Sequence, residues 1–248
     1  MKENILPTRR IYWEDDHCLE AEAVLVDIRG NAMVFDRTCF FPGGGGQPHD
    51  TGVVKFSDGQ KVDIVSVYAD AEVIWHNSSD PVSCAPGSTI QLIVNRQRRV
   101  LLARYHTVLH ILNTIALRDY GGWITGVQIA EDYSRIDFNL DRFSTEMRTD
   151  LERKVNGILE ENKTLSSYFL PEEEFRQRTG LLRTLEAKPP VINGQVRVVA
   201  IEGFDAQACG GTHVNGTAEI GKFQIFKTEN KGKINKRLYI RLDSNGPE

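Results

Sequence analysis

The hydrophobic pattern of the chain changes near residue 94. Before this point, short runs rich in β-branched residues alternate with turn sequences such as Arg29-Gly30-Asn31 and Ser57-Asp58-Gly59. Runs of this length joined by hairpin turns predict a small antiparallel sheet or barrel. The predicted strands cover residues 23–28, 33–35, 53–56, 62–68, 73–75 and 89–94.

From Arg96 to about Tyr120 the apolar residues recur at helical spacing, and Gly121-Gly122 marks the end of the predicted helix. Further strands are predicted at 134–140, 164–170 and 196–201, helices at 145–162 and from Pro171, and a hairpin from 222–227 with 236–242. The predicted fold class is therefore α+β. A small antiparallel β-barrel, residues 1–94, is followed by an α+β domain with a central antiparallel sheet, residues 95–248.

The composition of the chain indicates its cellular compartment and limits the classes of partner that it can bind. No apolar run approaches the roughly 18 to 20 residues that span a bilayer, so we expect no membrane partner. The four cysteines are scattered without a Cys-x-x-Cys pair. This usage is typical of a reducing compartment, and we expect a cytoplasmic protein. The net charge of −4 argues against a globally basic nucleic-acid binder, so nucleic-acid contacts require local basic clusters.

Two short clusters carry metal-ligand chemistry. His106 and His110 lie four residues apart on the predicted helix, so both rings leave one face one turn apart. Cys209 and His213 have the same spacing on a loop whose two glycines let both ligands face one point. A thiolate with two or three imidazoles suits tetrahedral zinc better than magnesium or calcium. Two alternatives stay open, namely histidines satisfied within the core and Cys209 as a small buried hydrophobe.

The fold must bring these two distant half-sites together, unlike a zinc finger. A domain of this size forms a core without metal, so we expect a functional site more than a structural one. Four protein ligands close a structural zinc site, whereas a catalytic site usually keeps one position open. In the catalytic case His213 or His106 is the loose ligand or a proton carrier.

A glycine run, Gly43, Gly44, Gly45 and Gly46, precedes Gln47. Without side chains, these backbone amides suit close approach to a phosphate, a ribose or the partner domain. The run lacks the Gly-Lys-Ser/Thr ending of a nucleotide-binding P-loop. We expect the loop to bind substrate with Gln47 as its polar contact, and a plain flexible turn is the alternative.

Basic residues gather at the start of the long helix and in the last hairpin, where only Glu229 opposes them. Such clusters supply phosphate contacts for RNA on an acidic protein. The alternative is ordinary solvation, or protection of an edge strand by lysine. The residues predicted to contact RNA are Arg96, Arg98, Arg99, Arg104, Lys231, Lys233 and Lys236.

Residues 41–47, Phe-Pro-Gly-Gly-Gly-Gly-Gln, together with the two ligand clusters form a highly specific pattern. With them the chain resembles the free-standing alanyl-tRNA editing proteins, relatives of the alanyl-tRNA synthetase editing domain. The resemblance implies a barrel followed by an editing domain that deacylates mischarged alanine tRNA with zinc. It also implies a substrate-sensing hydroxyl after the histidine helix, for which Thr125 is the candidate and Gln128 the second.

The leading hypothesis is hydrolysis of the 3′-terminal ester of alanine tRNA that carries serine, or possibly glycine. The catalytic set is then His106, His110, Cys209 and His213, which bind one zinc per chain, with Thr125 and Gln128. The expected partner is tRNA, with no DNA. Two rival hypotheses are a tRNA-binding module with a structural zinc, and a zinc hydrolase of small esters or amides. Salt-sensitive tRNA binding separates the second rival from the leading hypothesis.

Overall fold

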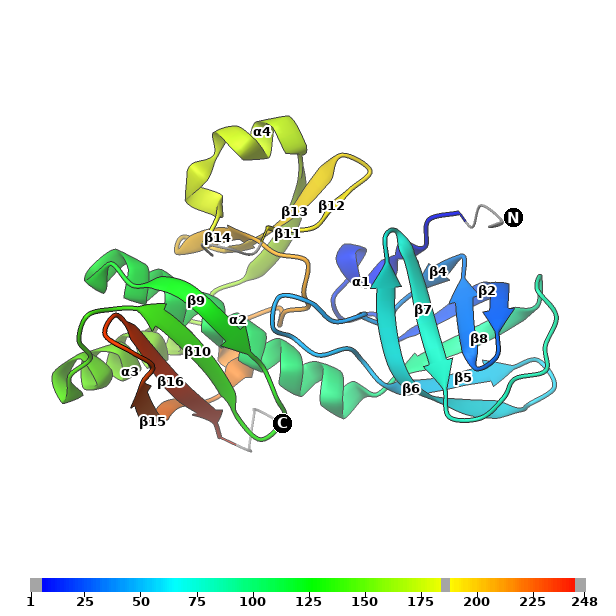
Figure 1. The fold of residues 1–248 in the computed structure, drawn as a ribbon, viewed down its shortest axis with the longest axis horizontal. Helices are drawn as coiled ribbons and strands as arrows, with labels where there is room; N and C mark the ends of the chain where they lie inside the picture. Colours follow the sequence, from blue (N-terminus) through cyan, green and yellow to red (C-terminus); the bar gives the residue numbers. More distant parts are fainter. Residues whose placement is uncertain (1–5, 184–187, 244–248) are drawn as a thin grey trace. The chain divides into compact units, whose positions relative to one another are not determined.

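The computed structural model describes residues 6–183 and 188–243 (Figure 1). The chain packs as two units, one of Met1–Gly44 with Pro48–Val100 and one of Gly45–Gln47 with Leu101–Glu248. Both units contain antiparallel sheet, and the second adds the long helices, which confirms the α+β class. The division into domains of residues 1–94 and 95–248 stays a prediction.

The six predicted N-terminal strands form a closed antiparallel barrel, in the order β2-β3-β7-β6-β5-β8. Side chains alternate along each strand, and Leu25, Val34 and Leu92 are fully buried inside. Closure leaves no free sheet edge, which removes a risk of aggregation. The strands are β2 (Glu20–Arg29), β3 (Ala32–Phe35), β5 (Gly52–Phe56), β6 (Lys61–Asp70), β7 (Val73–Ser78) and β8 (Thr89–Val94).

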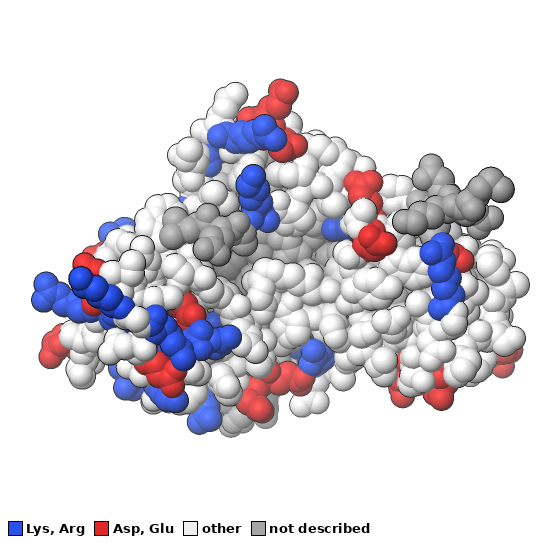
Figure 2. Space-filling view, viewed as in Figure 1, with Lys and Arg blue, Asp and Glu red and all other residues white. Residues whose placement is uncertain are grey.

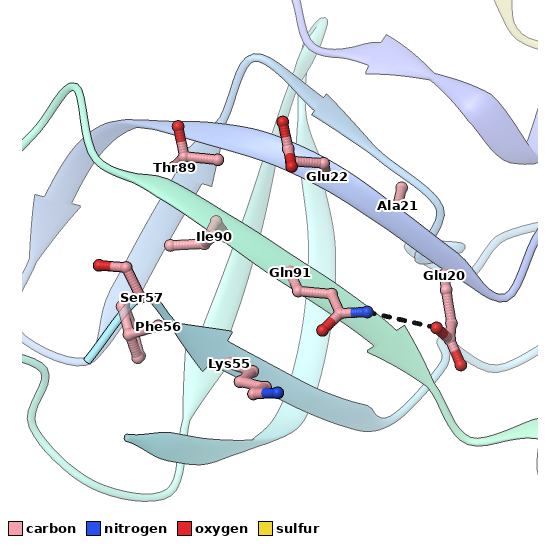
Figure 3. A pocket seen from close by; sticks show the side chains of 9 residues that line it. All are labelled: Glu20, Ala21, Glu22, Lys55, Phe56, Ser57, Thr89, Ile90 and Gln91. Atoms are coloured by element: carbon pink, nitrogen blue, oxygen red, sulfur yellow. Dashed lines mark hydrogen bonds between the residues drawn. The ribbon is translucent and has the colours of Figure 1, made fainter. Parts of the chain in front are cut away.

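Short elements that the sequence pattern did not predict flank the barrel. A parallel pair joins β1 (Arg9–Arg10) to β4 (Arg37–Thr38), and α1 (Ile11–Glu14) follows β1. Elements of two to four residues have too few positions to display a period. Figure 3 shows a groove on the barrel, where Gln91 donates a hydrogen bond to Glu20 at 3.3 Å. The groove is lined by Glu20, Ala21, Glu22, Lys55, Phe56, Ser57, Thr89, Ile90 and Gln91.

A buried ion pair closes the base of the glycine loop. Asp50 accepts a hydrogen bond from the Phe41 amide at 2.7 Å, and the Asp50 amide donates to the Phe41 carbonyl at 2.9 Å. The Arg99 guanidinium pairs with Asp50 and donates to the carbonyls of Cys39 at 2.6 Å and Asp16 at 3.0 Å. Arg99 is 2% exposed and Asp50 fully buried, so these bonds satisfy both charges inside the first unit.

The second unit is built around helix α2 (Arg96–Tyr120), whose predicted bounds are confirmed. Its apolar residues pack with α3 (Thr145–Glu160) against one face of an antiparallel sheet, β15-β16-β10-β9. Ser144 caps α3 by accepting a hydrogen bond from the Met147 amide at 3.3 Å. The strands are β9 (Trp123–Gln128), β10 (Ser134–Asn139), β15 (Phe223–Asn230) and β16 (Asn235–Leu242).

A second sheet in this unit corrects the prediction of one central sheet. Strand β13 (Gln195–Ile201) pairs with β11 (Leu165–Pro171), β12 (Val191–Ile192) and β14 (Asp205–Ala208). Strands β12 and β14 are too short for a sequence pattern, and a bulge between Ile124 and Gly126 interrupts the pairing of β9 with β10. Short helices α4 (Glu172–Gln177), η1 (Thr179–Leu181) and η2 (Thr217–Ile220) complete the unit.

By length and composition, helix α2 is long and apolar enough to cross a bilayer. This corrects the expectation that no segment of the chain is apolar enough to do so. However, 83% of its most apolar 18-residue stretch is buried inside the protein. The packing of α2 against α3 and the sheet accounts for this composition.

Replacing Asp50 with alanine leaves the Arg99 charge buried without its carboxylate. We expect the Asp50→Ala change to lower the free energy of unfolding by about 3–5 kcal/mol, measured by urea denaturation. Exposed Glu22 on β2 provides the control, because Glu22→Ala should change stability by less than about 0.5 kcal/mol. Equal stability of the two variants would show that the ion pair adds nothing.

Candidate metal centre

The structure brings His106, His110, Cys209 and His213 together, with their ligand atoms all within 4.8 Å of one another. The Sγ atom of Cys209 lies 3.5 Å from His106 Nε2 and 3.3 Å from His213 Nε2. Ligands of a tetrahedral zinc, at about 2.0–2.3 Å from the ion, lie about 3.3–3.8 Å apart. Two of the donor separations fall in this range, so the four residues could hold one metal ion.

Helix α2 supplies two of the four donors. His106 and His110 leave one face of the helix, and their ring centroids are 5.0 Å apart. The other face of α2 packs in the core, where Val108, Leu112 and Ile115 are buried. Because both histidines belong to a rigid element, their spacing is fixed before any metal binds.

The loop after β14 supplies Cys209 and His213, and its glycines permit the approach. A Cβ atom on Gly211 would lie 2.3 Å from Cε1 of His106 and 2.7 Å from Oε1 of Gln47. No side chain fits in that space, so this position requires glycine. Arg197 on β13, which is 1% exposed, holds the loop by donating to the Gly211 carbonyl at 2.8 Å.

Gln47 fixes the orientation of His106. Its Oε1 atom accepts from the Thr212 amide at 3.1 Å and lies 2.8 Å from His106 Nδ1. A carbonyl oxygen only accepts, so Nδ1 carries the proton and donates. The lone pair of Nε2 is then directed to the metal position, as the ring of a metal-binding histidine requires.

His213 is oriented in the same way by Thr107. The Thr107 hydroxyl donates to the Ala103 carbonyl at 2.9 Å and lies 3.0 Å from His213 Nδ1. The hydroxyl proton is used by the carbonyl, so the oxygen accepts from Nδ1 and leaves Nε2 with its lone pair. The sequence argument missed this role of Thr107, which lies next to His106 in the helix.

Burial keeps the imidazoles neutral, which metal binding requires. It lowers the pKa of His110 to about 3, and the charges of Arg183 and Arg197 add to the effect. The pKa values of His106 and His213 also lie well below the ordinary histidine value, first because of burial and then because of neighbouring positive groups. Neutral imidazoles with a cysteine sulfur form a borderline-soft donor set that suits zinc.

A polar network ties α2 to β14 beside the cluster. The amide nitrogen of Gln207 lies 3.1 Å from the His110 carbonyl oxygen and 2.7 Å from an Asp205 carboxylate oxygen. The Thr114 hydroxyl lies 2.8 Å from the same carboxylate oxygen, and Asn113 donates to Gln207 at 3.0 Å. Since β14 ends directly before Cys209, this network holds the two pairs of ligands at a fixed separation.

The sequence left three uses of the glycine loop open, namely close approach to a phosphate, to a ribose or to the partner domain. In the structure, two of its residues make contacts with a structural role. Gly46 accepts a hydrogen bond from the Ile129 amide at 2.8 Å, and a Cβ on Gly46 would lie 2.8 Å from the Val127 carbonyl oxygen. Gln47 is 2% exposed and its amide donates to Thr212 at 2.7 Å. Gln47 therefore supports the metal cluster, and its expected polar contact with substrate stays a prediction. Gly43, Gly44 and Gly45 also have positive φ angles.

Two of the arginines predicted to contact RNA are buried. Arg104 is 7% exposed and donates to the carbonyls of Ile220 at 2.7 Å and Asp243 at 3.0 Å. Arg99 binds Asp50 as described above, so neither guanidinium reaches the surface to meet a phosphate. Arg98 donates to the His49 carbonyl at 3.1 Å, while Arg96 is exposed.

The hairpin lysines differ from one another. Lys236 is 6% exposed and donates to the Lys233 carbonyl at 3.1 Å, which places its charge inside the hairpin. Lys231 pairs with Glu229 at 3.3 Å, and Lys233 is exposed. Glu229 is not the only opposing acid, because Asp137 pairs with Arg237 at 2.7 Å.

Thr125 and Gln128, predicted to sense substrate, lie on the exposed face of β9. The Thr125 hydroxyl donates to Asn235 at 2.9 Å, and Gln128 accepts from Arg135 at 2.7 Å. These bonds link β9 to β16 and β10 of its own sheet. Neither of these two hydrogen bonds reaches a residue of the metal cluster, so the role of Thr125 and Gln128 toward substrate stays a prediction.

Comparison with known proteins defines the class to which this fold and site belong. Residues 196–239 match the family described as the threonyl and alanyl tRNA synthetase second additional domain, and residues 15–98 match the class II (A) tRNA synthetases. The alanine–tRNA ligase of Pyrococcus abyssi is 37% identical over 90% of this chain and 24% of its own length. The chain is thus similar to about a quarter of the length of this ligase, and residues 196–239 are similar to the second additional domain of such synthetases.

Two relatives match along their whole length. The alanyl-tRNA editing protein AlaX-M of Methanosarcina acetivorans is 33% identical, and that of Saccharolobus solfataricus 34% identical, over 95% of this chain and 99% of theirs. The chain belongs to the AlaX-M family of alanyl-tRNA editing proteins.

Replacing Gln47 with leucine tests the orientation of His106, because the variant keeps the volume and removes the acceptor. We expect Gln47→Leu to lower zinc affinity by about 10- to 100-fold, measured by competition with a chromophoric chelator. Gln60→Leu, at an exposed hairpin position, is the matched control and should bind zinc as the parent does. Equal affinities of the two variants would rule out this role for Gln47.

Proposed function

We propose that this protein is a zinc-dependent deacylase of mischarged alanine tRNA. The cluster of three histidines and one cysteine, with tautomers fixed by Gln47 and Thr107, carries the proposal. Membership in a family of alanyl-tRNA editing proteins supplies the substrate class. A cytoplasmic location is part of the proposal, since the scattered free cysteines suit a reducing compartment.

One zinc per chain would be held by His106, His110, Cys209 and His213. Bound zinc supplies Lewis acidity, which polarises an ester carbonyl or lowers the pKa of water. Gln47 and Thr107 keep the imidazoles aligned, and Arg197 holds the ligand loop. Four side chains would fill all four coordination positions of a tetrahedral zinc. A coordination position open to substrate or water therefore requires that one donor be a loose ligand, and His213 or His106 is our candidate.

The substrate ester joins a wrong amino acid, serine or glycine, to the terminal ribose. A site that spares the alanine ester while cleaving the serine ester needs a polar partner for the serine hydroxyl, because alanine fits wherever serine fits. Thr125 and Gln128 stay our candidates for that partner. The exposed face of β9 that they occupy would then have to meet the 3′ end of the tRNA.

Two other functions give different outcomes. A tRNA-binding module with a structural zinc should unfold when the metal is removed, whereas the enzyme should remain folded and lose activity. The second unit has a large apolar core built from α2, α3 and one sheet, which favours a folded metal-free protein. A hydrolase of small esters would need no exposed cations, and its activity would not depend on tRNA binding.

Deacylation of serine-, glycine- and alanine-charged alanine tRNA by purified protein, with and without chelator, tests the proposal. We expect hydrolysis of the serine ester, its loss with chelator, and its loss in Cys209→Ala and His110→Ala, whose zinc content should fall. Cys84→Ala, at a half-buried barrel position, is the control and should retain both. Full metal occupancy and activity in the two ligand variants would overturn the assignment.

Charge reversal of the hairpin tests RNA contact. Changing Lys231 and Lys233 to glutamate should weaken tRNA binding and flatten its salt dependence by about one unit of slope per lost contact. Lys61→Glu, an exposed barrel lysine, is the control for a change of net charge alone. A salt slope equal to that of the parent would assign these lysines to solvation. Lys236 is left intact because its side chain is buried.

A further inference from the structure

Three aromatic rings gather on the face of the β15-β16-β10-β9 sheet that does not pack on α2. The ring centroids of Tyr133 and Phe226 are 6.0 Å apart, those of Tyr133 and Tyr239 are 5.8 Å apart, and those of Phe226 and Tyr239 are 6.1 Å apart. The core face of the same strands is completed by other residues, including Ile225 and Ile240, which are fully buried. The three rings are therefore not needed for that core.

Two cations lie on these rings. The guanidinium of Arg241 lies 4.3 Å from the centroid of Phe226, and the ammonium of Lys227 lies 4.9 Å from that of Tyr239. Tyr239 and Arg241 alternate on β16 with buried Leu238 and Ile240, so both project to the outer face. We call Tyr133, Phe226, Lys227, Tyr239 and Arg241 the aromatic face.

The surroundings of the aromatic face are mixed but carry several cations. Figure 2 shows Lys and Arg side chains gathered over β10 and β16, with acidic groups among them. Glu229 pairs with Lys227 at 2.6 Å and accepts from the Tyr239 hydroxyl at 2.9 Å, so that side of the face is neutralised. Arg241 is exposed, and Tyr133 is 39% exposed. The Tyr133 ring and the Arg241 guanidinium both lie next to the Phe226 ring, and such a ring and cation match the base and the phosphate of one nucleotide.

We infer that the aromatic face binds unpaired nucleotides of RNA, with a base stacked on Tyr133 and the adjoining phosphate on Arg241. Base stacking on exposed aromatic side chains beside cations is the usual way in which proteins hold single strands. The exposed guanidinium of Arg241 complements the negative charge of a phosphate, which favours RNA over a protein partner. The inference rests on the proposed function only in taking tRNA as the natural source of that strand.

Binding of a fluorescent single-stranded oligoribonucleotide, followed by anisotropy, tests the stacking without any deacylation. Tyr133→Leu keeps an apolar side chain and removes the ring, so we expect affinity to fall by about 5- to 100-fold. Tyr133→Phe should bind as the parent does. Tyr168→Leu is the matched control, because Tyr168 is 36% exposed on β11 of the other sheet. Far-UV circular dichroism and urea midpoints check that each variant is folded.

A Tyr133→Trp variant adds a direct signal, since its indole fluorescence should be quenched when a base stacks on it. Equal binding by the parent and Tyr133→Leu, or equal losses in Tyr133→Leu and Tyr168→Leu, would overturn the proposal. A parent protein that binds no oligoribonucleotide would also overturn it and leave the face to a protein partner. None of these results depends on zinc or on ester hydrolysis, so a failure here is separable from a failure of the proposed function.

Discussion

The hydrogen bond between His106 Nδ1 and Gln47 Oε1 joins three separate segments of the second unit. One oxygen atom accepts from the ring of a helix residue at 2.8 Å and from the Thr212 backbone amide at 3.1 Å. It therefore fixes the tautomer of one ligand and the path of the loop that holds two others. The same atom explains the glycine at position 211, because any side chain there would meet both partners. Catalytic geometry of this kind depends on supporting residues as much as on the ligands themselves.

Buried arginines stabilise irregular segments in both units. Arg99, Arg104 and Arg197 each direct a guanidinium at backbone carbonyls of loops or strand ends, where no sheet partner is present. A guanidinium offers five donors in a fixed plane, so one side chain can satisfy several acceptors at once. Each buried charge costs desolvation energy, which these bonds and the Asp50 carboxylate offset. These side chains thus hold the loops that carry functional residues, in addition to backbone bonds such as that from the Ile129 amide to the Gly46 carbonyl.

Much of this structure follows from local pattern, and the remainder depends on distant partners. The six barrel strands and helix α2 were predictable because each repeats a period over enough residues. The four metal donors were recognisable from their residue types and spacing. The burial of Arg99 and Arg104 was not recognisable from the sequence. The local sequence around a helical arginine is the same whether the guanidinium binds water or a carbonyl far along the chain. Strand β14 was missed for its length, although it ends directly before Cys209.

Counting basic residues overstates how much charge this protein can offer to RNA. Arg99, Arg104, Arg197 and Lys236 contribute to the formal charge of −4 but are buried and bound to the protein itself. The surface available to phosphate is accordingly less basic than the sequence indicates. Affinity for RNA on such a chain requires a component that does not come from counterion release, and stacking on aromatic rings is of that kind. The exposed ring of Tyr133 can supply this stacking, while the exposed guanidinium of Arg241 meets the phosphate.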